Sequence, residues 1–504
     1  MRNRTVNKSG AVAVHGIVGV MVGASLLLAS CTVGPNYVRP SAEVPATYKE
    51  TEGWKKAEPG DNLQKGPWWE IFVDPQLNTL EERVNVSNQN IAQSDAQFRQ
   101  ARAMVQAARA GFYPQVTVGP AVTHSRGSSN IGGSIPSGTV SNFILPMDAS
   151  WEVDIWGRIR RTVEASEANA QASAADLEAM RLSMQAELAQ DYFQLRTLDA
   201  QRQLLDATVS AYQKSLELTK NRYASGVASR ADVLLAETQL KTTQAQAIDI
   251  GVQRAQLEHA IAVLVGSPAS IFSIGITPLE MTAPPAIPVG LPSELLERRA
   301  DIAAAERLVA AANAQIGVAE AAYYPTVTLS AAAGLESSQL SNLLTWPSRF
   351  WSIGASVLET VFDGGQRKAV SEEARAAYDA TVASYRQTVL GAFQEVEDNL
   401  AALRILEEEA QVQVEAVTAA RQSLAVTTNQ YKAGTASYLD VIVTQAIALN
   451  NERTAIGIFG NRITAAVLLM KALGGGWDVC SLPTTVDCGD SNGKLGRLSS
   501  QYVR

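Results

Sequence analysis

The sequence predicts a mainly helical, internally duplicated chain that carries four β-strands of the kind that crosses an outer membrane. Three observations support this fold class. A ten-residue turn occurs twice, a stretch of about 65 residues after Gly157 contains no Pro or Gly, and each half contains two segments in which apolar and polar residues alternate. The turns predict helical hairpins, the long stretch predicts one very long helix, and the alternation predicts strands with one apolar face.

The repeated turn runs from Tyr223 to Asp232 and again from Tyr431 to Asp440, so that residue n corresponds to residue n + 208. In each copy a helical pattern stops at a glycine, the residue preferred in the left-handed position after a helix. A Ser-x-x-Asp sequence follows, and this is a capping box for a second helix. Each copy is therefore predicted to be a helical hairpin, and the chain to be two copies of one plan.

Composition and charge argue against several classes of function. The 504 residues are 46% hydrophobic and 18% charged, so the chain can bury a large core. The net charge of −8 and the lack of a basic stripe argue against a nucleic-acid partner. The three histidines, His15, His124 and His259, are far apart in the sequence, and no nucleophile is paired with a base. We therefore expect neither an enzyme nor a metal site.

The N-terminus predicts export and a lipid anchor. Three basic residues precede an apolar run that ends at Leu28, which is the pattern of a secretory signal. The following Ala-Ser-Cys31 is similar to a bacterial lipobox, and the resemblance implies cleavage before Cys31 and a covalent lipid on it, with no other cofactor. Thr32 after the cysteine is compatible with transport to the outer membrane. The alternative is an uncleaved anchor helix, since about 20 apolar residues can span a bilayer.

Four segments alternate with the period of two that is typical of strands. They cover residues 115–123, 147–155, 326–335 and 353–357. Their lengths are near the ~10 residues that a tilted transmembrane strand needs, and Phe112, Tyr113 and Trp156 lie at the ends of the first pair. Together with the export signal this favours membrane strands over a globular sandwich.

The polar side of the second segment is acidic. Asp148, Glu152 and Asp154 alternate there with apolar residues. If this side faces the lumen of a pore, these residues would favour cations.

Four strands cannot close a barrel. An open edge in lipid would leave backbone groups unpaired at a cost of several kcal/mol each, as an order of magnitude. Membrane strands would therefore require an oligomer. Since bacterial barrels begin at about eight strands, two chains would close a small barrel and three a twelve-stranded one.

The long helical stretch carries a heptad pattern of small residues. At 1.5 Å per residue it would be roughly 100 Å long, which indicates a coiled coil. Its predicted seam is Ala165, Ala168, Ala172, Ala175, Ala179, Leu182, Ala186, Ala189 and Phe193. The predicted seam of the second half is Val370, Ala374, Ala377, Thr381, Ser384, Thr388 and Gly391. Small seam residues suit a hollow ring of helices, and a plain bundle or an exposed rod is the alternative.

Three further segments carry a family resemblance. The mature start Cys31-x-x-Gly-Pro-x-Tyr37, the segment from Leu291 to Ile302 and the ending Ala-Leu-Gly-Gly-Gly-Trp477 resemble the outer-membrane factor (TolC-like) family, in its lipoprotein (NodT-type) branch. Ala300 stands where the family usually has Pro. The resemblance covers nearly all of the mature chain. It implies a trimer whose twelve-stranded barrel continues into a long periplasmic α-helical barrel.

The resemblance also implies a function. The chain is expected to be the outer-membrane channel of a tripartite efflux pump, a passive duct for drugs or other small toxic compounds that extends into the periplasm. Its implied partners are a periplasmic adaptor and an inner-membrane pump of the resistance-nodulation-division (RND) type. One alternative is the duct of a type I protein secretion system, which usually lacks the lipobox. Another is a structural coiled-coil lipoprotein or adaptor without membrane strands.

Family geometry places the two hairpin turns at the periplasmic mouth. The exposed tip residues expected to contact the adaptor are Gly226, Val227, Ala228, Ser229, Gly434, Thr435, Ala436 and Ser437. Asp232 and Asp440 could ring the aperture or cap their helices, and the capping box favours capping. Relatives often carry an acidic residue where this chain has Val443, so Leu439 with Val443 becomes the candidate constriction.

The predicted domains follow from these boundaries. They are a signal peptide (1–30), a lipid-anchored tether (31–76), repeat 1 (77–265), a Pro-rich crossover (266–292), repeat 2 (293–473) and a C-terminal tail (474–504). The tail contains Cys480 and Cys488. In an oxidising periplasm we expect a disulfide between them, because two cysteines supply too few ligands for a metal.

Overall fold

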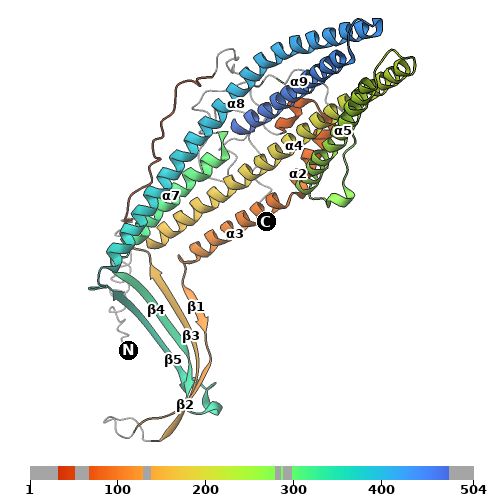
Figure 1. Ribbon diagram of the computed structural model, residues 1–504. Helices are drawn as coiled ribbons and strands as arrows, with labels where there is room; N and C mark the ends of the chain where they lie inside the picture. The colour runs from red at the N-terminus through yellow and green to blue at the C-terminus, as the bar shows by residue number, and fades with distance from the viewer. Residues whose placement is uncertain are drawn as a thin grey trace, which may run out of the picture. The chain divides into compact units, whose positions relative to one another are not determined.

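The computed structural model describes residues 32–50, 67–128, 138–277, 285, 287 and 298–475 (Figure 1). The chain divides into two compact units. The strand unit comprises residues 1–41, 99–172 and 305–385, and the helical unit comprises residues 42–98, 173–304 and 386–504. Each unit is built from segments of both repeats, because the long helices pass from one unit into the other.

The strand unit contains one antiparallel sheet (Figure 1). Its strands are β1 (Gln115–Val118), β2 (Ala121–Arg126), β3 (Thr139–Val153), β4 (Thr326–Ser337) and β5 (Arg349–Leu358). Both β1 and β2 pair with β3, which pairs with β4, which pairs with β5. The four predicted strand positions are therefore present. The first is broken at Gly119-Pro120, since proline cannot donate to the ladder, and the second begins eight residues before the predicted start.

The sheet has two open edges within the described residues. One edge is formed by β1 and β2 and the other by β5, because the strand order runs from β1 and β2 through β3 and β4 to β5. Trp151 pairs with Leu329, which pairs with Ala355, so the register is continuous across the three long strands. The sheet thus offers unpaired backbone groups on both sides.

Corresponding long helices in the two halves of the chain have nearly the same length. The helices and 3₁₀ turns are η1 (Trp68–Phe72), α2 (Pro75–Ser87), α3 (Gln89–Ala110), α4 (Arg158–Ala224), α5 (Arg230–Leu264), η2 (Ala269–Ile271), α7 (Ala300–Ala321), η3 (Leu340–Asn342), η4 (Trp346–Ser348), α8 (Gln366–Ala433) and α9 (Tyr438–Ala472). α4 and α8 have 67 and 68 residues, and α5 and α9 have 35 each. The duplication seen in the turns therefore extends to whole helices. α9 is apolar enough to cross a membrane, but 56% of its most apolar window is buried, as in a core helix.

The coiled-coil prediction holds for α4 and needs correction for α8. Most predicted seam residues of α4 are buried, including Ala175 and Ala186, which have no exposed surface. In α8 the predicted seam is exposed or half-buried. The buried apolar residues in its middle part include Tyr385, Val389, Ala392, Val396, Leu400 and Leu403. They lie three or four residues apart on another face, where larger apolar side chains gain more from burial than Ser384 or Thr388 does.

Candidate functional site: the paired hairpin turns

The two hairpin turns have the geometry that the repeated sequence predicts. Gly226 and Gly434 adopt φ angles of 69° and 81°. In the first turn the amide of Val227 donates to the carbonyl of Arg222 at 2.8 Å, and the second turn has the corresponding bond. This bond between residues five apart is the Schellman pattern that ends a helix. Most tip residues are exposed, and only Ala228 and Ala436 are half-buried.

Asp232 and Asp440 cap the helices that begin after the turns. The amide of Asp232 donates to the Ser229 hydroxyl at 3.1 Å, and the Ser229 amide donates to the Asp232 carboxylate at 2.9 Å. Ser437 and Asp440 make the same two bonds at 3.3 and 3.0 Å. The Ser437 hydroxyl also donates to the Asp440 carboxylate at 2.7 Å and lowers the pKa of that carboxyl. The capping interpretation of both aspartates is confirmed.

Buried tyrosines join the hairpin of α8 and α9 to the hairpin of α4 and α5. Tyr431 and Tyr438 are 5% and 3% exposed, and their ring centroids are 5.3 Å apart. The Tyr438 hydroxyl lies 3.2 Å from the Ser215 hydroxyl, and the Tyr431 hydroxyl lies 3.5 Å from that of Thr219. Arg222 donates to the Tyr431 carbonyl at 3.0 Å, and its guanidinium lies 4.6 Å from the ring centroid. We call these five residues the hairpin lock.

Burial keeps the Tyr438 phenol of the hairpin lock neutral. Burial raises the pKa of Tyr438 and that of the neighbouring Tyr212. A neutral phenol can both donate and accept a hydrogen bond, which suits the hydroxyl partners from α4. The lock thus joins the two hairpins through uncharged hydrogen bonds, an apolar cluster and one arginine. It was not predicted from the sequence, although both tyrosines lie within the second copy of the repeated turn.

Leu439 and Val443 lie on the open face of α9. They are 57% and 49% exposed, while Tyr438 and Val441 beside them are buried. Residues four apart share one side of a helix, so the two side chains form an apolar pair that the described chain leaves uncovered. Their role as a constriction depends on neighbouring copies and stays a prediction.

The acidic residues of the second predicted strand do not form one continuous negatively charged face, because arginines pair with two of them. Asp148 is exposed on β3. Glu152 accepts two hydrogen bonds from Arg158, at 2.8 and 2.6 Å. Asp154 lies beyond the end of β3. Its carboxylate accepts hydrogen bonds from two backbone amides in the first turn of α4, each at 2.9 Å, and from the Arg160 side chain. The first turn of a helix leaves amides without partners, and Asp154 satisfies them. Of the three predicted acidic residues, only Asp148 has no ion pair within the part of the chain that the structure describes.

The tether is bound along helices of the strand unit. Cys31 lies outside the described residues. Arg161, with 4% of its side chain exposed, donates to two tether carbonyls and to the Asn36 side chain at 3.0 to 3.2 Å. Tyr37 packs against alanines of α4 and α7. The tether between residues 33 and 37 therefore follows a defined path.

Two further predictions concern cysteines and metals. Cys480 and Cys488 lie outside the described residues, so their disulfide stays a prediction. Among the residues that the structure describes, no three His, Cys, Asp or Glu side chains are grouped to hold a metal ion.

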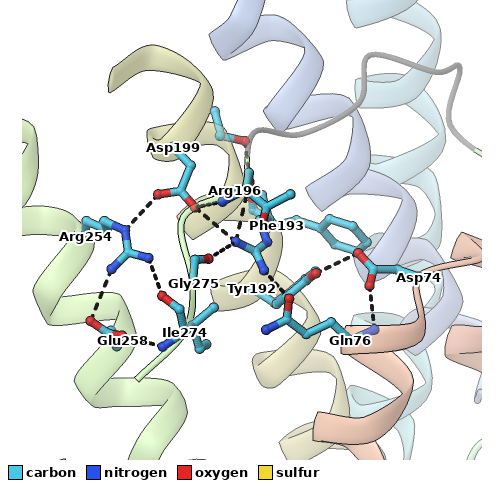
Figure 2. A network of polar contacts seen from close by, with 12 residues as sticks. Asp74, Gln76, Tyr192, Phe193, Arg196, Asp199, Arg254, Glu258, Ile274 and Gly275 are labelled. Carbon is cyan, nitrogen blue, oxygen red and sulfur yellow. Dashed lines mark hydrogen bonds and ion pairs between the residues drawn. The ribbon is translucent and has the colours of Figure 1, made fainter. Parts of the chain in front are cut away.

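A buried charge network in the helical unit was not predicted (Figure 2). Asp199 accepts hydrogen bonds from Arg196 at 3.0 Å and from Arg254 at 2.7 Å. The side chains of Arg196 and Asp199 are 3% and 1% exposed. Charges this deep must be paired, and here each carboxylate oxygen has its own guanidinium. We call Arg196, Asp199 and Arg254 the first clamp.

The first clamp binds the chain that follows α5 (Figure 2). Arg196 donates to the carbonyl of Gly275 and Arg254 to that of Ile274, both at 2.7 Å. Asp199 accepts the amide of Thr277 at 3.2 Å. The start of the predicted crossover is therefore fixed by backbone hydrogen bonds to buried charges. The three clamp residues look like ordinary polar residues of a helix in the sequence. They come together only when α4 and α5 pack against each other.

Comparisons with known proteins agree with this architecture. A family model described as outer membrane efflux protein matches residues 81–267 and 291–475. The toluene efflux pump outer membrane protein TtgC of Pseudomonas putida is 30% identical over 90% of this chain and 94% of its own. The cation efflux system protein CusC of Escherichia coli is 28% identical over 90% of this chain and 97% of its own.

A solved structure has the same fold. The outer-membrane channel OprN superposes with a TM-score of 0.83 and is 30% identical, covering 89% of this chain and 100% of the other. The two ranges that the family model matches fall on the two repeats of this chain.

Proposed function

This chain belongs to the outer membrane efflux protein family, and from that premise we propose that three copies of it form one duct. It is an outer-membrane channel component of an efflux pump. In the proposed assembly each copy gives four strand positions to a barrel of twelve, and the long helices line a periplasmic tunnel. A periplasmic adaptor and an inner-membrane pump of the RND type complete the system, and the pump supplies the energy.

The open edges of the sheet are the observation that carries this proposal. β5 at one edge and β1 with β2 at the other each pair with a strand on one side only, and their outer sides have no strand partner among the described residues. Within lipid each unpaired backbone group costs several kcal/mol, as an order of magnitude, so both edges need strands from other copies. β5 runs antiparallel to β4, as β1 runs antiparallel to β3. Pairing β5 of one copy with β1 and β2 of the next continues the sheet.

The side chains of β5 support a lipid-facing surface. Trp351, Ile353 and Val357 point to one side of the strand and are 76%, 78% and 68% exposed. Trp346 just before the strand and Phe362 just after it are 75% and 88% exposed. An apolar strand bounded by aromatic residues is typical of an outer-membrane barrel, where lipid covers it.

The hairpin turns support a docking tip and a closure beside it. The exposed tip residues, among them Val227 at 64% exposure, are proposed to contact the adaptor. Three copies of Leu439 and Val443 are proposed to meet around the tunnel axis and exclude ions, since a hydrophobic constriction can close a pore by dewetting. The hairpin lock holds the two hairpins together in the closed form.

The proposed lipid on Cys31 anchors each copy beside the barrel. Lipid chains alone bind a membrane reversibly unless a second element helps, and the strands would be that element.

The names of the relatives do not identify the compound that this chain transports. One is named for toluene and another for cations, although both resemble this chain over nine-tenths of its length. The proposal is therefore limited to a passive duct for small compounds that the pump selects.

Electrophoresis and bilayer recording together test this function. We expect the purified protein to migrate as a trimer that heat converts to a monomer, and to form ion-conducting channels in planar bilayers. We expect Leu439→Ser to raise the conductance of the resting channel, because a hydroxyl favours water in the constriction. A protein that migrates as a monomer and conducts no ions would instead be a structural periplasmic lipoprotein.

A further inference from the structure

The proposed lipid-facing side of the sheet carries one charged residue along β3, β4 and β5. Successive residues of a strand point to opposite sides, so Arg349 shares a side of β5 with Trp351 and Ile353. Residues that pair across strands share a side as well, which adds the odd-numbered residues of β3 and β4. Among all of these only Arg349 is charged. A single cation on an otherwise apolar side suggests a specific anionic partner.

Arg349 lies at the end of β5 that is farther from the helices. α7 leads into β4 and β5 leads into α8, so the β4–β5 loop lies at the opposite end of these strands (Figure 1). In the proposed duct, on which this inference rests, the helices are periplasmic and this end faces the outer leaflet. The eight residue steps from Val357 to Arg349 rise roughly 21 Å at a strand tilt near 40°, which is close to the ~25 Å apolar band of such barrels. Arg349 is therefore at the level of the outer headgroups.

The β4–β5 loop is folded and presents apolar side chains. The hydroxyls of Thr345 and Ser348 both donate to the Asn342 carbonyl, at 2.6 and 2.7 Å. Leu344 and Trp346 are nevertheless 80% and 75% exposed. Lipid would cover these side chains, whereas water would leave their apolar surface hydrated. The loop is therefore shaped to contact the membrane beside β5.

Trp346 orients the Arg349 side chain. The Nε atom of Arg349 donates to the Trp346 carbonyl at 3.1 Å, and the guanidinium lies over the Trp346 ring. Its terminal nitrogens, Nη1 and Nη2, make no hydrogen bond or ion pair within the part of the chain that the structure describes. A guanidinium held in this way offers a planar fork of donors, which matches the oxygens of a phosphate.

The outer end of the sheet has no acidic residue to compete for this cation. Residues 119–147 and 337–358 contain two Arg and no Asp or Glu, although the whole chain has 50 acidic residues. Glu336 lies just outside the second range, on the opposite side of β4 from Leu335, and accepts a hydrogen bond from the Asn142 side chain at 2.8 Å. The charge of this end therefore favours an anionic leaflet.

We propose that Arg349, Trp346 and Leu344 bind the phosphorylated end of an outer-leaflet glycolipid of the lipid A type. The guanidinium donates to phosphate oxygens, the Trp346 ring contacts the sugar, and Leu344 contacts the acyl chains. We call these three residues the rim site. The occupant is a lipid and not free phosphate, because Trp346 and Leu344 are exposed apolar residues and the site continues the lipid-facing side of β5.

Native mass spectrometry of the protein in detergent tests the rim site. The probe is lipid A with its phosphates, compared with the same lipid after the phosphates are removed. We expect the unmodified protein to bind the phosphorylated lipid about tenfold more tightly, because charge-assisted hydrogen bonds favour it. Arg349→Gln should abolish this preference. Lys368→Gln is the matched control, since it removes an exposed cation beyond the helical end of β5, and it should keep the preference.

A further variant separates the lipid contact from the phosphate contact. Leu344→Ser should weaken the binding of both lipids and keep the preference for the phosphorylated one, because it changes only the apolar part of the rim site. Excess inorganic phosphate should not displace the lipid. Displacement by inorganic phosphate would overturn the proposal, since the site would then recognise free phosphate. A preference that persists in Arg349→Gln would also overturn it.

Bilayer recording of the unmodified preparation separates this inference from the proposed duct. A conducting trimer that binds both lipids equally would overturn the rim site alone. A protein that neither conducts nor forms trimers would contradict the duct, and the rim site with it.

Discussion

At the scale of single residues, the second hairpin turn depends on a carboxylate whose pKa is lowered by its hydrogen bonds. Ser437 donates to the Asp440 carboxylate from its hydroxyl and its amide, and these bonds lower the pKa of Asp440. The charged form is the one that caps α9. Its contribution is therefore present above the ordinary pKa of aspartate, near 3.9, and is lost as the pH falls through the lowered value.

The first turn of α9 should therefore be insensitive to mild acid. We expect amide exchange at residues 438–441, corrected for the intrinsic chemical rate, to show no added opening between about pH 7 and pH 5. Asp440→Ala removes the carboxylate half of the capping box and should speed exchange there, because the Ser437 amide then loses its acceptor. An opening transition near pH 5 in the unmodified protein would show that the pKa of Asp440 is raised and not lowered.

The hairpin lock makes a separate residue-scale prediction. Arg222 joins two hairpins through the Tyr431 carbonyl and ring, so Arg222→Leu should favour separation of the hairpins. A hydrogen bond from a charged group contributes about 1.5–3 kcal/mol, which corresponds to a roughly tenfold or larger shift toward the open form. We expect a higher open probability in bilayer recordings and greater sensitivity of cells to large antibiotics. Arg230→Leu, at the exposed start of α5, is the control. Equal leakage in both variants would exclude a locking role for Arg222.

At the scale of elements, periodicity predicted the long helices well and their contacts less well. The lack of Pro and Gly after Gly157 predicted α4 almost to its ends. The predicted seam of α8 is not the face that is buried within one chain, where larger apolar side chains at a spacing of three or four residues are buried instead. The strand break at Gly119-Pro120 follows from proline chemistry, whereas the ion pairs of Glu152 and Asp154 depend on where α4 begins. Local patterns predict elements, and packing decides which faces meet.

The tether provides an element-scale test. Arg161 binds residues 33–36 through backbone and side-chain oxygens. We expect Arg161→Leu to release this segment, so that limited proteolysis cuts it at least about tenfold faster while the barrel remains intact. Arg181→Leu removes an arginine whose ion pair, among the residues that the structure describes, is with Glu178 three residues earlier on the same helix, and it should leave the rate unchanged. Equal rates in the two variants would mean that Arg161 does not hold the tether.

At the scale of the whole molecule, the sequence predicted the family, the duplication and the four strand positions because each leaves a local signature. It did not predict the hairpin lock or the first clamp. Tyr431 and Arg222 are far apart in the sequence, as are Asp199 and Arg254, and helix-surface positions of this kind show no pattern until the helices pack. No single segment of the sequence predicts the number of copies, because two or three copies could both pair the backbone groups at the open edges of the sheet.

Ion selectivity is a property of the assembled duct. Among the described residues, no arginine compensates Asp148, unlike Glu152 and Asp154, so Asp148→Asn should reduce the preference for cations about twofold if it lines the lumen. The control is Glu82→Gln, an exposed position on α2 in the helical unit. Reversal potentials under a salt gradient measure the change. An unaltered reversal potential in Asp148→Asn would place this carboxylate outside the conducting path.

The central claim is that the open strand edges are closed by three copies. Native mass spectrometry of the protein released from detergent counts the copies directly. We expect one species with three times the mass of the mature, lipidated chain, because twelve strand positions then close the barrel. A stable monomer, or a dimer that would close only eight, would contradict the claim.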